Sequence, residues 1–217
     1  MKGPRPKPFE CPEPVFWYLV GLIASDGNLG RNTCNVNITS KHQEFLEQIR
    51  VAIGSRGSIS HKSNGTGQIA YQLQFKSRIL RDRLSEIGLT PNKSLTIGPL
   101  HVPDEWFHDF LRGVIDGDGN IRRWVHPTNR REQWVVRICG ASRPFIAWLQ
   151  ETIKYLWGIE GKIHEHIYKD GRRHPIYTLK LGKLAAKVLL SRCYYSGALA
   201  LERKRDSAIE CITTFVG

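Results

Sequence analysis

An internal repeat constrains the fold of this chain more than any other feature of its sequence. The segment LVGLIASDGN at residues 19–28 recurs as LRGVIDGDGN at residues 111–120, an offset of 92 residues. Similar segments follow each copy at offsets that grow to 100, 104 and 106 residues. Because extended self-similarity indicates repeated folding units, we predict two units, residues 1–103 and 104–217, related by a pseudo-two-fold axis.

Each unit is predicted to contain a helix, two strands, a second helix, two more strands and a final helix. Strands are indicated where apolar and polar residues alternate, as in NVNIT at residues 35–39. For the first unit we expect helices at residues 14–25, 41–53 and 77–88, strands at 28–33, 35–40, 57–63 and 68–76, and a linker at 94–105. The fold class is therefore α+β, with a four-stranded antiparallel sheet in each unit.

The charge of the chain indicates a polyanionic partner. Its 217 residues include 32 Lys and Arg against 20 Asp and Glu, a formal net charge of +12. Each predicted unit carries +6 of this charge. We therefore expect a nucleic acid as the partner, with an acidic membrane as the weaker alternative.

Cysteine spacing and hydropathy indicate the cellular setting. The five cysteines are odd in number and widely spaced, which is untypical of zinc knuckles and disulfide frameworks, so we expect reduced thiols. No stretch has the ~18 apolar residues of a membrane span, and the first residues lack the apolar region of a signal peptide. We expect a soluble, intracellular protein of the cytoplasm or nucleoid, or of an organelle, with no membrane partner.

The two repeated segments resemble the signature of LAGLIDADG homing endonucleases. The repeat, the element order and the basic charge resemble the single-chain members with two motifs, and the resemblance covers nearly all of the chain from residue 14. It implies two saddle-shaped sheets packed through the two motif helices. It also implies a monomeric, Mg²⁺-dependent endonuclease that cuts both strands of double-stranded DNA at a long asymmetric target and leaves 3′ overhangs.

Small residues in both motifs predict a close helix–helix seam. Gly21 and Ser25 lie four residues apart on one helix, and Gly113 and Gly117 match them on the other. Such a flat stripe lets two helices approach closely. The alternative is ordinary packing, in which the glycines are merely tolerated.

An acid ends each motif, Asp26 in the first and Asp118 in the second. The glycine after each, Gly27 and Gly119, is expected at a left-handed helix end. Two carboxylates brought together at helix C-termini repel each other unless a cation lies between them. Oxygen ligands without nearby His or Cys suit Mg²⁺ rather than Zn²⁺. We expect Mn²⁺ to replace Mg²⁺ and Ca²⁺ to support binding without cleavage.

The resemblance implies that Asp26 and Asp118 bind the metals, which activate water and stabilise the leaving 3′ oxygen. It also places a basic residue from the end of each unit near the phosphate, here Lys93 and Lys204, with Arg203 as the rival of Lys204. A solvated lysine at a helix end is the alternative for both.

Asp116, Ser40 and Gly140 stand at positions where we expect roles outside the catalytic set. We expect Asp116 to form hydrogen bonds near the seam, with metal binding as the alternative. The glutamine that related enzymes carry after the second strand is replaced by Ser40 and Gly140, and Gln43 is the candidate substitute.

Polar side chains on one face of each sheet are the candidates for contact with the major groove, where Asn and Gln suit adenine and Lys and Arg suit guanine or phosphate. In the first unit they are Asn35, Asn37, Thr39, Ser58, Ser60, Lys62, Gln72, Gln74 and Lys76. In the second unit they are Arg122, Trp124, Arg137, Lys162, His164, His166, Tyr168, Thr178 and Lys180. Because the two faces differ, we expect an asymmetric site of about two DNA turns. A merely solvated sheet face is the alternative.

The long hairpin at residues 122–134 contains four arginines and two tryptophans, and we expect it, through Arg130 and Arg131 among others, to grip DNA beyond the core site. His164 and His166 point to one strand face, where base or phosphate contact is favoured over metal binding because no third ligand is placed beside them.

Two alternative functions remain open from the sequence: an RNA maturase that binds intron RNA, and a DNA-binding protein that does not cleave. Intact acids in both motifs count against the second. Only about 13 residues precede the first motif helix, so we expect a free-standing, intron-encoded protein rather than an intein.

Overall fold

The computed structural model describes residues 11–30, 33–63, 69–168 and 173–214. Its first unit consists of α1 (Glu13–Ser25), β1 (Asn28–Leu29), β2 (Asn35–Ser40), α2 (Gln43–Ala52), β3 (Ser58–Ser63), β4 (Ile69–Lys76) and α3 (Arg78–Ile87). The second consists of η1 (Asp104–Trp106), α4 (Phe107–Asp118), β5 (Gly119–Val125), β6 (Glu132–Gly140), α5 (Arg143–Trp157), β7 (Lys162–His166), β8 (Ile176–Leu181), α6 (Lys183–Cys193) and α7 (Glu202–Thr213). The predicted α+β class and element order are confirmed.

Two expectations about individual elements differ from the structure. The first strand is shorter than predicted, since β1 ends at Leu29. The second unit ends with two helices, α6 and α7, where the repeat predicts one. The additional helix follows an irregular segment at residues 194–201, whose length the matched motifs do not reveal.

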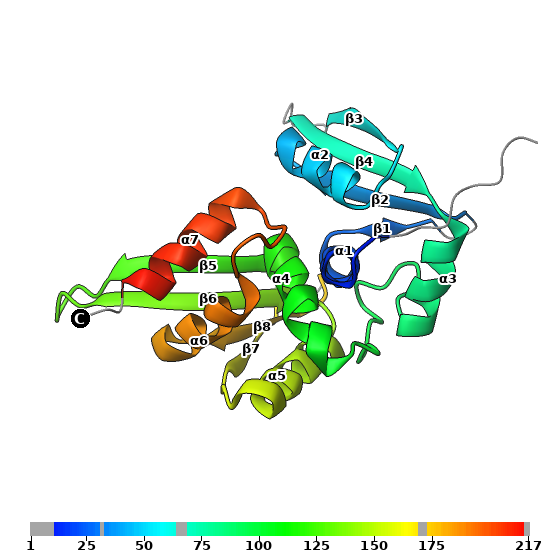
Figure 1. Ribbon diagram of the computed structural model, residues 1–217. Coiled ribbons are helices and arrows are strands. Elements are labelled where there is room, and N and C mark those ends of the chain that lie inside the picture. The colour runs from blue at the N-terminus through cyan, green and yellow to red at the C-terminus, as the bar shows by residue number, and fades with distance from the viewer. Residues whose placement is uncertain (1–10, 31–32, 64–68, 169–172, 215–217) are drawn as a thin grey trace, which may run out of the picture.

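Each unit is built on one four-stranded antiparallel sheet. The strand orders are β1-β2-β4-β3 and β5-β6-β8-β7, so the two sheets have the same topology. Helix α2 contacts β2, β3 and β4, and α5 contacts β6 and β8, so each sheet has one face covered by helices. In Figure 1, α1 and α4 lie side by side at the centre, with one sheet on each side of them.

The motif helices are buried almost all round. Every residue of α1 from Phe16 to Ala24 is buried, and so are nearly all residues of α4 between Phe107 and Asp116. A helix that is apolar on every side belongs in a core, because no side of it gains from contact with water. These two helices therefore form the centre of one continuous hydrophobic core that joins both units.

Local signals define the ends of the outer helices. Ser77 precedes α3, and its Oγ accepts a hydrogen bond from the main-chain N–H of Leu80 at 3.1 Å. Gly88 ends the same helix with a φ of 104°, a left-handed conformation that favours glycine. Such caps were recognisable from the residue types alone.

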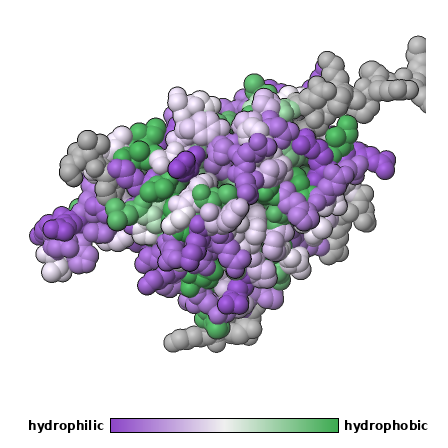
Figure 2. Space-filling view, turned by 60° about the horizontal axis from the view of Figure 1, so that its bottom comes forward, coloured by the Kyte–Doolittle hydropathy of each residue, from purple (hydrophilic) through white to green (hydrophobic). Residues whose placement is uncertain are grey.

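The surface and the cysteines agree with the composition. Hydrophilic residues cover most of the face in Figure 2, and its hydrophobic patches are small and separated. All five cysteines are free, as expected. In the part of the chain that the structure describes, no helix has the length and apolar character needed to cross a membrane.

Candidate active site and nucleic-acid interface

The two motif helices touch through their glycines. A Cβ on Gly21 would lie 2.9 Å from the main-chain nitrogen of Val114 and closer still to the carbonyl oxygen of Phe110. A Cβ on Gly113 would lie 2.8 Å from the nitrogen of Leu22. The neighbouring atoms are backbone and cannot move aside, so the predicted close seam is confirmed and ordinary packing is excluded.

The seam brings together the two acids that follow it. Asp26 caps the end of α1, Asp118 is the last residue of α4, and their carboxyl groups are within hydrogen-bonding reach of each other. Partial burial, and next the charge and hydrogen bond of Asp26, raise the pKa of Asp118 to about 6. A cation bound between the two carboxyl groups would offset the repulsion that raises the pKa of Asp118.

The glycines after these acids serve a different purpose from the one predicted. Neither Gly27 nor Gly119 is left-handed, and Gly119 is extended, with φ −83° and ψ 158°. A Cβ on Gly27 would lie 2.5 Å from the Cα of Ile23, and one on Gly119 would lie 2.7 Å from the Cα of Ile115. Glycine is needed because the chain passes directly against the preceding helical turn.

The acids offer a donor set that fits a hard divalent cation. They supply two negatively charged carboxylates, the oxygen ligands that such cations prefer. Among the described residues, no group of three or more His, Cys, Asp and Glu side chains is arranged to hold a metal. Further ligands of a cation at this pair would therefore be neutral oxygens, from the main chain, water or a bound substrate.

Two buried lysines anchor the ends of the motif helices. Lys93, 6% exposed, donates from Nζ to the carbonyl oxygen of Gly27 at 2.5 Å. Lys204, 3% exposed, donates to the carbonyl oxygens of Ile115 and Asp116 at 2.5 and 2.7 Å. The alternative of solvated lysines is therefore wrong.

The lysines are also electrostatically coupled to the two acids. Burial lowers the pKa of Lys204 to about 8 and lowers the pKa of Lys93, while Asp26 and Asp118 oppose both shifts. Arg203, the rival of Lys204, is exposed and lies beside it. Lys204 is therefore buried near the two acids, whereas the side chain of Arg203 is exposed to solvent.

An open pocket of about 530 Å³ lies beside Asp26 at the seam. Its lining includes Ser40, His42, Gly117 and Arg203, so both units contribute to it. Ser40 Oγ accepts a hydrogen bond from the main-chain N–H of His42 at 3.1 Å.

The other positions singled out after the second strand lie elsewhere. Gln43, the suggested substitute for the missing glutamine, lines a different pocket with Glu44 and Glu47. Its predicted role beside the acids is therefore not supported. Gly140 has no side chain, and a Cβ there would meet Ile146.

Comparison with known proteins supports the fold assignment. No family model matches the sequence, and no curated protein matches it. Among solved structures, the homing endonuclease I-WcaI bound to its DNA recognition sequence matches with a TM-score of 0.62 and 11% identity, over 95% of this chain and 94% of that chain. I-SmaMI bound to uncleavable DNA matches with a TM-score of 0.61 and 14% identity, over 93% and 88% of the two chains. The chain has the LAGLIDADG fold.

The same LAGLIDADG fold occurs in WhiA. The N-terminal LAGLIDADG domain of DUF199/WhiA matches with a TM-score of 0.57 and 17% identity, over 93% of this chain and 90% of that one. Full-length DUF199/WhiA from Thermatoga maritima matches with a TM-score of 0.59 and 16% identity, over 93% of this chain. The chain spans only 61% of the length of that protein.

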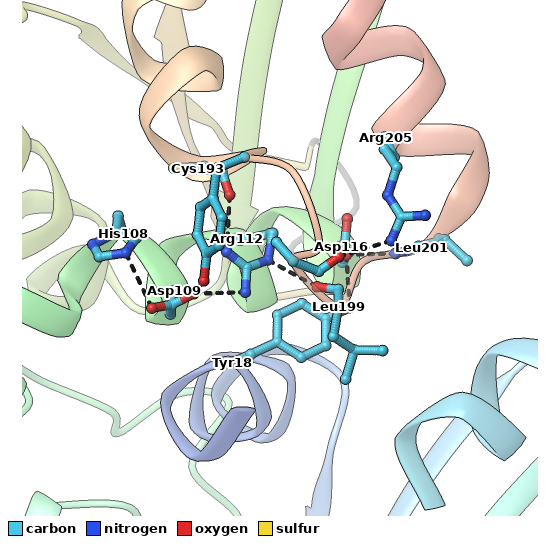
Figure 3. A network of polar contacts seen from close by, with 11 residues as sticks. Tyr18, His108, Asp109, Arg112, Asp116, Cys193, Leu199, Leu201 and Arg205 are labelled. Atoms are coloured by element: carbon cyan, nitrogen blue, oxygen red, sulfur yellow. Dashed lines mark hydrogen bonds and ion pairs between the residues drawn. The ribbon is translucent and has the colours of Figure 1, made fainter. Parts of the chain in front are cut away.

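Asp116 of the LAGLIDADG seam forms hydrogen bonds, as expected, and it is also buried, with its carboxylate occupied by protein donors. It accepts hydrogen bonds from the hydroxyls of Tyr18 and Tyr194 and from the main-chain N–H of Leu201, each at 2.7 Å (Figure 3). Burial raises its pKa, and these hydrogen bonds oppose the rise. Asp116 therefore ties α1 and the segment before α7 to α4.

A second buried network was not anticipated. Arg112 Nη2 lies 2.6 Å from Asp109 Oδ1 within α4, and both side chains are almost fully buried (Figure 3). Arg112 also donates to the carbonyl oxygens of Leu199 and Cys193 at 2.8 and 2.9 Å. The signal in the sequence was an Asp and an Arg three residues apart in a largely apolar helix. The two carbonyl groups that Arg112 contacts lie more than 80 residues further along the chain.

The candidate groove contacts of the first sheet share one face. Asn37 pairs with Gln74, Thr39 pairs with Gln72, and the neighbouring strand continues both rows. Val36, Ile38 and Leu73 are buried on the other face, as predicted. The side chain of Lys62 lies outside the described part of the chain. Whether these side chains contact DNA stays a prediction.

The second sheet presents its own set on the equivalent face. Arg137 pairs with Lys180, and His164 pairs with Thr178. The ring of His166 packs edge-on against Tyr168, with centroids 4.8 Å apart. In the described residues, no third metal-binding side chain accompanies the two histidines.

The long hairpin has two different faces. Arg122, Arg130 and Arg131 are exposed, and Trp124 is partly exposed. Trp134 is instead buried, and Arg123 forms ion pairs with Glu132 and, on α7, with Glu210. The predicted contacts Arg122, Trp124, Arg130 and Arg131 are therefore open to solvent, and whether they contact DNA stays a prediction.

Proposed function

We propose that this protein is a site-specific, Mg²⁺-dependent DNA endonuclease that cuts both strands of a long asymmetric duplex target and leaves 3′ overhangs. The observation that carries the proposal is the meeting of Asp26 and Asp118 at the glycine seam, where the charge of Asp26 helps to raise the pKa of Asp118. A protein that only binds DNA gains nothing from two repelling carboxylates. Because one chain supplies both acids, it is expected to act as a monomer.

Asp26 and Asp118 would hold the cation, which would supply positive charge to activate a water nucleophile and to stabilise the leaving 3′ oxygen. Mn²⁺ is expected to substitute for Mg²⁺, and Ca²⁺ to support binding without cleavage. Lys93 and Lys204 hold their ammonium groups at the helix ends beside the acids. Their charge lowers the free energy of the more negative transition state of phosphoryl transfer.

Binding of the duplex is assigned to the exposed faces of the two sheets. Amides on the first sheet and basic side chains on the second fit the donor and acceptor pattern of base edges in the major groove. DNA-bound neighbours of the same fold support this assignment. The exposed arginines of the hairpin at residues 122–134 are suited to phosphates outside the central site.

The test is cleavage of a randomised duplex library with Mg²⁺ or with EDTA, followed by sequencing of the cut ends. We expect metal-dependent ends at one long asymmetric consensus, and loss of double-strand cutting in Asp26→Asn and in Asp118→Asn with nearly unchanged DNA binding. Asp206→Asn, which alters an exposed acid on α7, is the matched control. Full cleavage by either motif variant would overturn the proposal.

The alternatives are an RNA maturase and a DNA-binding protein that does not cleave. The fold alone does not separate them, because it occurs both in homing endonucleases and in the N-terminal domain of WhiA. Site-specific binding without cuts in any metal would favour the non-cleaving protein. Tighter binding to structured intron RNA than to duplex DNA would favour the maturase.

A further inference from the structure

The two sheets carry different side chains at equivalent positions of their central strands. Asn37 on β2 pairs with Gln74 on β4, and Arg137 on β6 pairs with Lys180 on β8. These are the same offsets, 100 and 106 residues, that relate the two copies of the repeat. We call Asn37 and Gln74 the amide pair and Arg137 and Lys180 the cationic pair.

The outer strands β3 and β7 differ in charge in the same way as the central strands. Lys162 on β7 pairs with Lys180, whereas its counterpart Ser58 on β3 pairs with Gln74. The first strands carry the same residue in both units, since Asn28 pairs with Asn37 and Asn120 pairs with Arg137. The charge difference therefore lies on the strands away from the seam.

The cationic pair has no acidic partner among the described residues. In the described part of the chain, no carboxylate lies within ion-pair distance of Arg137, Lys180 or Lys162. Other exposed arginines do have partners, as Arg123 has Glu132 and Glu210. Like charges directly opposite each other on neighbouring strands destabilise a sheet. The charges of these three side chains are therefore available to acceptors from outside the chain.

The amide pair is also incompletely satisfied. The Oδ1 atom of Asn37 is buried and accepts no hydrogen bond from the described residues. A buried polar atom without a partner costs free energy, so the amide of Asn37 gains by turning outward to a donor on the exposed face of the sheet. An asparagine amide turned toward adenine accepts from N6 and donates to N7.

The position of both pairs favours contact with base edges rather than with phosphates. Each sheet begins directly after a motif acid, since β1 starts two residues after Asp26 and β5 starts one residue after Asp118. The two pairs occupy the central strands, with a further strand on each side of them. Because the major groove admits a two-stranded ribbon, the central strands are the ones that reach the base edges.

We propose that the two sheets read half-sites of different composition, with Arg137 and Lys180 selecting guanine and Asn37 and Gln74 selecting adenine. This inference rests on the proposed function and names part of the target. Strands lie about 4.8 Å apart and bases rise about 3.4 Å, so each pair covers about two neighbouring base pairs. The target then has guanine at these base pairs on one side of the cut and adenine at the equivalent base pairs on the other.

The experiment is selection of tightly bound sequences from a randomised duplex library in EDTA, where binding is measured without cleavage. The full chain is compared with a swap variant, Arg137→Asn with Lys180→Gln, which gives the second sheet the residues of the first. Asn37→Ala with Gln74→Ala is the matched variant of the first sheet. Thermal unfolding of each protein verifies that it is folded.

The wild type is expected to select guanines in one half-site and adenines in the other. In the swap variant, the guanine preference should fall about tenfold or more at each affected base pair and change toward adenine, with the other half-site unchanged. The variant of the amide pair should lose only the adenine preference, in the opposite half-site.

Two outcomes would overturn the inference in distinguishable ways. A swap variant that binds all sequences more weakly, with unchanged base preference and a salt dependence reduced by about two phosphate contacts, places the cationic pair on the backbone. The inference then fails and the proposed function stands. A wild type that selects no consensus at all overturns both, because a site-specific endonuclease requires one.

Discussion

Gly21 and Gly113 face each other across the seam so closely that a Cβ built on either would lie 3.0 Å from the Cα of the other. The relationship is reciprocal, as the pseudo-two-fold repeat requires. It holds the backbones of α1 and α4 in contact over the turn that precedes Asp26 and Asp118. The site therefore depends on a packing contact between residues that have no side chain.

Substitution of a seam glycine should destabilise the whole protein. Gly113→Ala places a methyl group against the backbone of α1, and overpacking of this kind costs typically about 1–3 kcal/mol. Gly98→Ala is the control, because a Cβ there meets nothing within 4 Å. Urea unfolding of both variants measures the difference. Equal stability of Gly113→Ala and wild type would contradict the close seam.

The rate of cleavage should depend on pH in a bell shape. With the pKa of Asp118 at about 6, the acid is protonated at lower pH and binds a cation poorly. With the pKa of Lys204 at about 8, its positive charge is lost at higher pH. Single-turnover rates between pH 5 and 9 should fall on both sides. Lys204→Arg should remove the alkaline limb, since arginine stays protonated.

Removal of metal should make stability fall as the pH rises. The pKa of Asp118 is raised on folding, so the folded chain binds the proton more tightly than the unfolded chain. This contribution is present below the unfolded pKa of about 4 and is lost as the pH rises through about 6. In EDTA, the free energy of unfolding should therefore decrease between pH 5 and 7. Asp26→Asn should weaken this trend, because it removes the neighbouring charge.

Substitution of Lys204 should lower the stability of the protein much more than substitution of Arg203. Lys204→Met leaves buried carbonyl oxygens of α4 without their donor and should cost about 1–3 kcal/mol of stability, besides lowering the cleavage rate. Arg203→Ala removes an exposed side chain and should change stability by no more than about 0.5 kcal/mol. Thermal unfolding and cleavage rates of the two variants check this. The reverse order of destabilisation would make Arg203 the anchoring residue.

The buried ion pair of α4 should be sensitive to loss of one partner. Arg112→Met leaves Asp109 charged and buried, a change that typically costs about 3–5 kcal/mol. Lys154→Met is the control, because its ion pair with Glu160 is exposed and should contribute little. Denaturant titration of both proteins gives the two values, and similar costs would show that Asp109 is reached by water or loses its charge.

The features that follow from short-range patterns were predictable from the sequence. Two copies of a motif, alternation along the strands and the type of residue at helix ends are encoded within a few residues of one another. These patterns were sufficient to predict the α+β class, the element order, the close seam and the hydrogen-bonding role of Asp116. The acids were recognised because both copies place them at the same motif position.

Other features depend on contacts between distant segments, and local patterns could not reveal them. Gly27 and Gly119 look like helix caps in the sequence, but they are required by the turn against which the chain packs. The ion pair of Arg123 with Glu210 joins β5 to α7 across 87 residues of sequence, and no local pattern indicates it. The environment of a charge depends on which chains surround it, and that is the outcome of tertiary packing.

Tertiary packing also decides the environment of Lys93 and Lys204. Their place at the end of each unit was visible in the sequence, whereas their burial on helix carbonyls was not. The repeat specifies that two acids exist and that the halves are alike. Only the packing of α1 on α4 brings Asp26 to Asp118, because positions 92 residues apart in the sequence meet through backbone contacts that no single segment contains.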